Sequence, residues 1–253
     1  MTKRLWSLGL LAGTLALAGC DFDILNTNAP NESSLTGRSA LARTATGIFS
    51  QANANMAGQI QQWGIYGREG YNLLGNDPRA AGEEIAGPQD PGARAGGIWV
   101  GNYAAIRTIN TYIAAVDAAG DLTTQEKAAS RGFAKTLAAW HFYRLAVRSG
   151  PLGIPVDVGR PINADPAPFV SQANAFAHVI TLLDEAKTDL LAGGNAFPFT
   201  VAPGYAGFTT PANFAKFNRA LAAKAQVDRA LLAGCGAQCF TAALAALNES
   251  FIT

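Results

Sequence analysis

Apolar residues recur at spacings of three and four in several separate stretches, and this pattern restricts the fold more than any other feature of the sequence. In the stretch 98–118 the pattern is carried by Ile106, Ile109, Ile113 and Val116. Such spacing places all four side chains on one face of a helix. No stretch alternates apolar and polar residues over enough positions to require a β-sheet. Alanine is the commonest residue, which also favours helix. We therefore predict an all-α fold.

Helices are predicted over six stretches. They run from Thr36 to about Ala57, over 98–118, from Thr123 to Val147, over 171–192, over 211–233, and from about Phe240 onward. Glycine and proline interrupt 58–97, 151–170 and 193–209, which we expect to be long irregular loops or, for 58–97, a broken helix pair. The helix that ends at Val147 is apolar on nearly every side, so it should lie between other helices. The remaining helices each have one stripe that needs a covering neighbour, which predicts an array of antiparallel helix pairs.

The amino terminus has the pattern of an export signal. Lys3 and Arg4 precede an uncharged, mostly apolar run at 5–17. The run is shorter than the roughly 20 residues that a helix needs to span a bilayer, which favours a signal peptide over a membrane helix. The sequence LAGC at 17–20 resembles a bacterial lipobox, in which the cysteine takes a diacylglycerol. The alternative is a plain signal peptide followed by an unrelated cysteine.

These features divide the chain into three parts. We expect a lipoprotein signal peptide at 1–19, a lipidated tether at 20–35 and a helical domain at 36–253. Cys20 is the predicted lipidation site, with palmitate among its acyl chains. Such an anchor attaches a protein to the membrane surface without spanning it.

Composition and motifs exclude several functional classes. The 19 Lys+Arg balance the 18 Asp+Glu to a net charge of +1, and the basic residues form no stripe for nucleic acid. The chain has 2 His and 3 Cys, too few for a zinc-hydrolase site or a disulfide scaffold. It has no phosphate-binding glycine loop and no nucleophile elbow. We predict no enzyme, no metal and no cofactor. Cys235 and Cys239 should form either a short local disulfide or two free thiols.

Four segments resemble, in their order along the chain, the SusD/RagB family of outer-membrane nutrient-uptake lipoproteins. They are Cys20 with the acidic, Asn-rich residues after it, WVGNYAAIRTIN at 99–110, AKTLAAWHFYRL at 134–145 with GPLGIP at 150–155, and FNRALAAKAQVD at 217–228. The resemblance implies a tetratricopeptide-like array of helix pairs. It also implies a non-catalytic protein that binds glycan or another nutrient at the cell surface. The protein would be anchored in the outer membrane and act as the lid of a TonB-dependent, SusC-like transporter.

Two departures from the family leave alternatives open. Family members are usually longer, so the resemblance implies a fragment or a reduced member, incomplete at its carboxyl end. Asp21 directly follows the predicted lipidation site, which leaves inner-membrane and outer-membrane sorting both open. The alternative function is that of a helical-repeat envelope lipoprotein that binds only protein partners.

The irregular stretch 58–97 holds the candidate ligand-binding residues. Sugar binding needs flat aromatic faces for the apolar side of the ring, and planar amide, carboxylate or guanidinium groups for the hydroxyls. This stretch offers both kinds: Trp63, Tyr66, Tyr71, Asn76, Asp77 and Arg79. The alternative is that Trp63 and Tyr66 fill space between helices. Trp99 and Trp140 lie on helical stripes, so we expect them in the core, and we expect His141 in the interior.

Overall fold

The computed structural model of the protein describes residues 34–54, 56–71, 94–161 and 163–252. The chain divides into two compact units, 1–35 and 36–253, and nearly all of the described residues belong to the second. The predicted lipidation site, Cys20, lies outside the described residues. Among the helices that are described, none combines the length and the apolar character needed to cross a bilayer.

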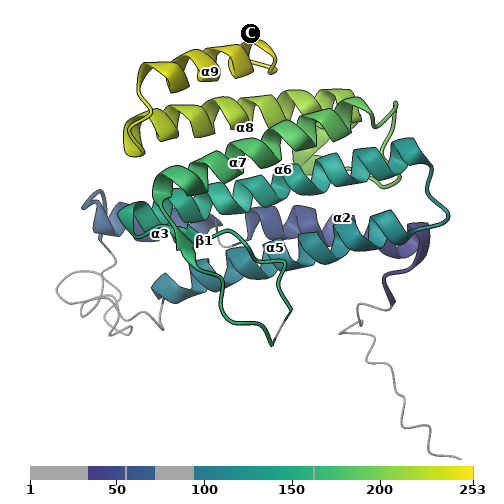
Figure 1. The fold of residues 1–253 in the computed structure, drawn as a ribbon, viewed down its shortest axis with the longest axis horizontal. Coiled ribbons are helices and arrows are strands. Elements are labelled where there is room, and N and C mark those ends of the chain that lie inside the picture. The colour runs from purple at the N-terminus through teal and green to yellow at the C-terminus, as the bar shows by residue number, and fades with distance from the viewer. Residues whose placement is uncertain (1–33, 55, 72–93, 162, 253) are drawn as a thin grey trace, which may run out of the picture. The chain divides into compact units, whose positions relative to one another are not determined.

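Seven α-helices make up most of the described part of the second unit (Figure 1). They are α2 (Gly37–Asn53), α3 (Met56–Tyr66), α5 (Arg94–Ala118), α6 (Thr124–Ser149), α7 (Gln172–Leu191), α8 (Pro211–Leu232) and α9 (Ala237–Asn248). Two 3₁₀ turns, η3 (Gly150–Leu152) and η4 (Pro203–Phe208), and two short strands, β1 (Ile154–Pro155) and β2 (Phe169–Val170), lie in the connections. From α5 to α9, helices that follow one another pack in antiparallel pairs, and α2 packs against α5, which confirms the predicted all-α fold class.

Helix α6 is the centre of the array. It packs against α2, α5, α7 and α8, and both hydrophobic clusters of the interior draw on its side chains. Its start is fixed by a capping box, in which Thr123 accepts from the backbone of Glu126 and Glu126 accepts from the backbone of Thr123. Phe133, Leu137 and Leu145 are fully buried on it. The prediction of a helix that lies between other helices is confirmed.

Helices α6 and α7 approach each other closely at Gly132. A β-carbon built at Gly132 would lie 2.6 Å from Leu190 Cγ and 2.8 Å from the carbonyl oxygen of Ala186. Only glycine lets the two backbones pack this closely. Around this contact, Phe133 packs against Phe199 at a ring-centroid distance of 4.8 Å. The predicted loop 193–209 therefore contributes to the core as well as connecting α7 to α8.

The amino-terminal helical region differs from the prediction. One helix was expected to run to about Ala57, but α2 ends at Asn53 and a second helix, α3, begins at Met56. The stretch 58–97 was expected to be a long irregular loop or a broken helix pair; helix α3 occupies its first part up to Tyr66, and α5 already begins at Arg94. These changes matter because they place Trp63 and Tyr66 on a helix.

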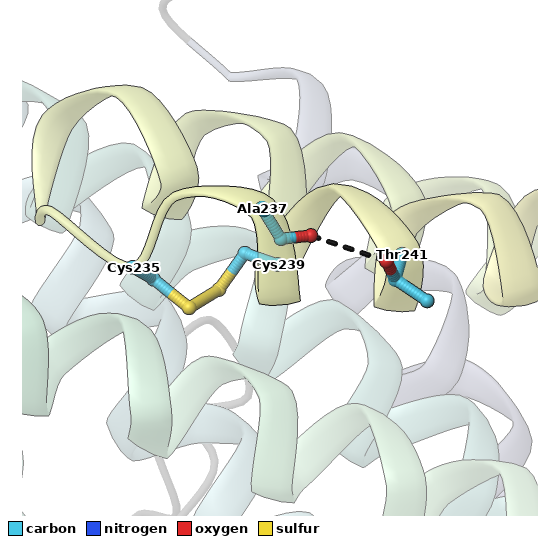
Figure 2. The surroundings of a disulfide bond; sticks show 4 residues. All are labelled: Cys235, Ala237, Cys239 and Thr241. Carbon is cyan, nitrogen blue, oxygen red and sulfur yellow. Dashed lines mark hydrogen bonds between the residues drawn. A yellow bond between two sulfur atoms is a disulfide. The ribbon is translucent and has the colours of Figure 1, made fainter.

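Helix α9 buries its apolar residues unevenly: Leu247 packs against the second hydrophobic cluster, but Leu244 does not. Cys239, Ala243 and Ala246 are its buried residues, whereas Leu244 is 62% exposed. Small side chains face α8 because the two helices are joined by a short turn and pack closely. Figure 2 shows that this turn is closed by a disulfide between Cys235 and Cys239, with a Cα–Cα distance of 5.7 Å. The disulfide ties the end of the α8–α9 turn to the first turn of α9.

Candidate functional site

The predicted ligand residues are only partly within the described structure. Trp63 lies on α3 with 44% of its surface exposed, Tyr66 ends the same helix half-buried, and Tyr71 follows it with 57% exposed. Three further candidates lie outside the described residues: Asn76, Asp77 and Arg79. A ligand-binding role for these six residues stays a prediction.

A second candidate site lies where the first turns of α5 face the connection between α6 and α7. A cavity of about 640 Å³ opens there. Its walls carry three aromatic rings and several charged groups: Trp99, Tyr103, Phe169, Arg107, Asp157, Arg160 and Asp165. Most of the remaining lining is proline, valine and alanine. We call this cavity the aromatic pocket.

The aromatic rings of the pocket come from two separate elements. Trp99 and Tyr103 are one turn apart on α5, with ring centroids 5.0 Å apart. Phe169 belongs to β2 and stacks on Trp99, with centroids 5.9 Å apart and planes 17° apart. Phe169 is 62% exposed, so one face of this stack is open to solvent. The arrangement offers a flat apolar surface at the mouth of the pocket.

Backbone contacts hold the connection against α5. β1 and β2 pair antiparallel, with Ile154 opposite Val170. Just before β1, Gly153 has a φ of +70°, and a β-carbon there would lie 1.9 Å from the carbonyl oxygen of Val170, so the pairing requires glycine. The hydroxyl of Tyr103 donates to the carbonyl of Pro155 at 2.8 Å. Burial raises the pKa of this Tyr103 hydroxyl, so the hydroxyl stays a donor at physiological pH.

Charged groups line the outer part of the pocket. Arg160 lies 3.6 Å from a carboxylate oxygen of Asp157 and donates to the carbonyl of Asp165 at 2.8 Å. The carboxylate of Asp157 is 68% exposed, and Arg107 is exposed on α5. Planar carboxylate and guanidinium groups beside an aromatic stack can bind hydroxyl groups of a ligand whose apolar face rests on the rings. Across the described residues, no three His, Cys, Asp or Glu side chains converge to hold a metal ion.

Sequence reasoning missed this pocket because it assigned Trp99 to the core. Trp99 does pack against the second hydrophobic cluster, but it is only partly buried and its other side faces Phe169. Trp140 is also only partly buried; it packs against both hydrophobic clusters, and its indole donates to the carbonyl of Ala52 at 3.0 Å. The signal that could have revealed the pocket is the proline-rich connection itself, where Phe169 follows charged residues and no helix is available to bury it.

The comparisons with known proteins bear on the fold. A SusD-like protein from Bacteroides fragilis NCTC 9343, known from its crystal structure, superposes with a TM-score of 0.58 at 13% sequence identity. The match covers 88% of this chain and 40% of that one, so this chain spans less than half the length of the SusD-like structure. No family model and no curated protein matches the sequence. The structure therefore has a SusD-like fold, as the resemblance in the sequence implied.

Proposed function

We propose that this protein captures carbohydrate, or another nutrient with a flat apolar face, at the cell surface without chemically changing it. The observation that carries the proposal is the open stack of Trp99 and Phe169 in a pocket of about 640 Å³. Pyranose rings rest their C–H faces on such rings, and the nearby Asp157 and Arg160 suit the hydroxyls. The SusD-like fold supports the same function.

The proposal includes an anchor and a partner. Acyl chains on Cys20 would hold the protein at the outer membrane, facing outward, and a TonB-dependent, SusC-like transporter would receive the ligand. Mass spectrometry of the mature amino terminus tests the anchor, because a diacylglycerol-modified Cys20 is expected as the first residue. Co-purification from membranes tests the partner, since a specific complex should bury about 1,000 Å² or more. An unmodified amino terminus would contradict the anchor.

The binding test uses variants of the exposed half of the stack. Phe169→Ala removes a ring that is 62% exposed, so the fold should survive. We expect oligosaccharide affinity, measured by calorimetry after a glycan-array screen, to fall about tenfold, because stacking on an aromatic ring contributes of the order of 1 kcal/mol or more. Phe240→Ala is the matched control, since Phe240 is 42% exposed on α9, outside the pocket. Equal affinity in both variants would remove the aromatic pocket as the site.

A second function, protein binding alone, is favoured by the outer surface of α8 and α9. Four exposed apolar side chains of these helices are Leu231, Leu232, Phe240 and Leu244. Exposed apolar patches often mark interfaces between proteins. Under this alternative the protein would capture an envelope protein and ignore every oligosaccharide. Release of reducing ends from an oligosaccharide by the purified protein would contradict both functions, because both are non-catalytic.

A further inference from the structure

Exposed apolar side chains gather on the last two helices. Of the fourteen large apolar side chains that are exposed in the described part of the chain, seven lie between Val227 and Ile252. Four of these seven line one cavity: Val227 on α8, Phe240 and Leu244 on α9, and Ile252 after α9. Single exposed apolar residues are common on protein surfaces, but a contiguous group marks an interaction surface. We call these four residues the α8–α9 face.

The α8–α9 face has hollows as well as projections. The cavity between the two helices has a volume of about 420 Å³, and its remaining walls are mostly alanine and leucine. A second cavity, of about 400 Å³, adjoins it, because Ala220, Lys224 and Ile252 line both. Phe240 and Leu244 are four positions apart and therefore project from the same side of α9. A partner surface can receive these two side chains and also fill the cavities.

The face is almost free of charge. Helix α9 contains no charged residue, and Lys224 is the charged side chain that lines the cavity. Its ammonium lies 3.6 Å from a carboxylate oxygen of Asp228 on the same helix. A partner that is recognised by charge needs a charged surface to meet, whereas interfaces between identical chains are more apolar. The net charge of +1 also causes little repulsion between two copies. A second copy of this chain is therefore the partner that suits the face.

Helix α9 lies at the edge of the array, where no other described helix covers its outer side (Figure 1). It packs mainly on α8, whereas α6 and α7 each pack against helices on two sides. An outermost helix of such an array needs a polar outer surface or a covering neighbour. Phe240 is 42% exposed and Leu244 is 62% exposed, so the outer surface is not polar there. A covering neighbour is therefore expected.

We propose that the α8–α9 face binds the same face of a second copy of this chain, with Phe240 and Leu244 of each copy in the cavity of the other. Such an interface has two-fold symmetry, because the same surface serves both copies. The apolar walls of the cavity favour burial of these side chains. The inference does not rest on the proposed function. The cavity and the aromatic pocket share no lining residue, so each copy keeps its own aromatic pocket.

Sedimentation equilibrium of the full chain tests the inference, in a detergent matched in density to the buffer because Cys20 is predicted to carry acyl chains. We expect a dimer with a dissociation constant of about 10 μM or less. Leu244→Glu places a charge in an apolar interface and should weaken the association at least about tenfold. Leu152→Glu is the matched control, since Leu152 is 82% exposed on η3 and lines neither cavity. It should leave the dimer unchanged, and circular dichroism checks that both variants keep their helices.

A mixture of two variants tests whether the face meets itself. Leu244→Glu and Leu244→Lys should each associate weakly alone, because like charges are brought together when identical copies meet. When the two variants are mixed, opposite charges are brought together, so dimers should form again. Binding of the α8–α9 face to a different surface of the second copy would not give this recovery, because the two substituted positions would not meet.

Three results would each overturn the inference. The original chain could stay monomeric up to about 100 μM, the dimer could survive Leu244→Glu, or the mixture could fail to associate. A monomeric chain that captures an envelope protein through Leu244 would assign the face to the alternative function instead. Failure of the proposed function is read separately, from oligosaccharide affinity and the Phe169→Ala variant, because the dimer does not involve the aromatic pocket.

Discussion

The positively charged side chains on the two halves of α6 have different kinds of partner. Near its amino end, Arg131 and Lys135 face α7, and each has two carboxylates: Arg131 pairs with Asp117 at 2.9 Å and Asp189 at 3.3 Å, and Lys135 pairs with Glu185 and Asp189, both at 3.0 Å. Near its carboxyl end, Arg144 and Arg148 face α3, where the described partners are amide and aromatic groups. Arg144 lies 5.8 Å above the ring of Trp140.

The two halves of α6 therefore differ in how their positive charges are compensated. The amino-terminal half is closely packed and its charges are paired, as expected of a segment that holds two helices together. The carboxyl-terminal half leaves buried donors without partners, which costs stability and is characteristic of functional sites. Substitutions in the two halves should therefore change the free energy of unfolding by different amounts and in different directions.

The largest effect is expected at Gly132. Gly132→Leu would force a side chain into the backbone of α7, where even a β-carbon would lie 2.8 Å from the Ala186 carbonyl oxygen. We expect the free energy of unfolding to fall by about 3 kcal/mol, measured by urea denaturation. Gly47→Ala on α2 is the control, because a β-carbon there meets nothing within 4 Å. That change should raise stability slightly, and a loss at both positions would show that close packing at α6 is not the cause.

The second effect tests the paired charges. Asp189→Asn removes the carboxylate shared by Arg131 and Lys135, and its side chain is only 17% exposed. We expect a loss of about 1–2 kcal/mol in the free energy of unfolding. Glu249→Gln, which breaks the exposed pair with Lys187, should cost less than about 0.5 kcal/mol. If the two variants lose the same amount, burial does not strengthen the pairs of the amino-terminal half.

The third effect is a pH dependence that belongs to the carboxyl-terminal half. Burial, with Arg144 nearby, lowers the pKa of His141 in the folded protein to about 3, against an ordinary value of 6.5. Below about pH 6.5 the unfolded chain takes up a proton that the folded protein does not. Stability is therefore present above pH 6.5 and is lost as the pH falls toward 3, by up to about 1.4 kcal/mol per pH unit.

Denaturation between pH 7 and pH 5 measures this dependence. His141→Gln keeps a polar group facing Asn102 and cannot titrate, so its stability should vary less over that range. A variant with the same slope as the original protein would assign the pH dependence to other groups.

Most of the fold could be predicted from the sequence because its signals are local. The capping box at Thr123 and Glu126, and the apolar spacing of Ile106, Ile109 and Val116, depend only on neighbours within a turn or two. The apolar stripe predicted for α9 is only partly buried: Leu247 packs against the second hydrophobic cluster, whereas Leu244 is 62% exposed. The side chains that pack most fully on α8 are small, Cys239, Ala243 and Ala246, and these give a weaker apolar signal than leucine.

The sites could not be predicted to the same extent because they join distant segments. The stack of Trp99 on Phe169 depends on a strand pair that Gly153 permits, and neither residue alone indicates a pocket. Similarly, the sequence predicts an interior His141, but the contact of Arg144 with Gln59 spans 85 positions. Tertiary packing decides which buried cation lacks a carboxylate partner. The apolar pattern of the sequence carries no information about that pairing.

The smallest effect gives the most direct test of the contrast between the halves. In the double variant Arg144→Met with Gln59→Leu, an uncompensated charge and the oxygen that accepts from it are replaced together by apolar groups of similar size. We expect the free energy of unfolding to change by less than about 1 kcal/mol, or to rise, because a buried charge without a counter-charge contributes no net stability.

The single variant Arg144→Met should lose more, about 1–2 kcal/mol, because it leaves Gln59 Oε1 buried without a donor. That order, with the double variant more stable than the single, is the reverse of what two independent stabilising residues would give. If the double variant is instead less stable than the single one, Arg144 and Gln59 stabilise the fold as a pair. The charges on the two halves of α6 would then have different partners, but both halves would contribute to stability.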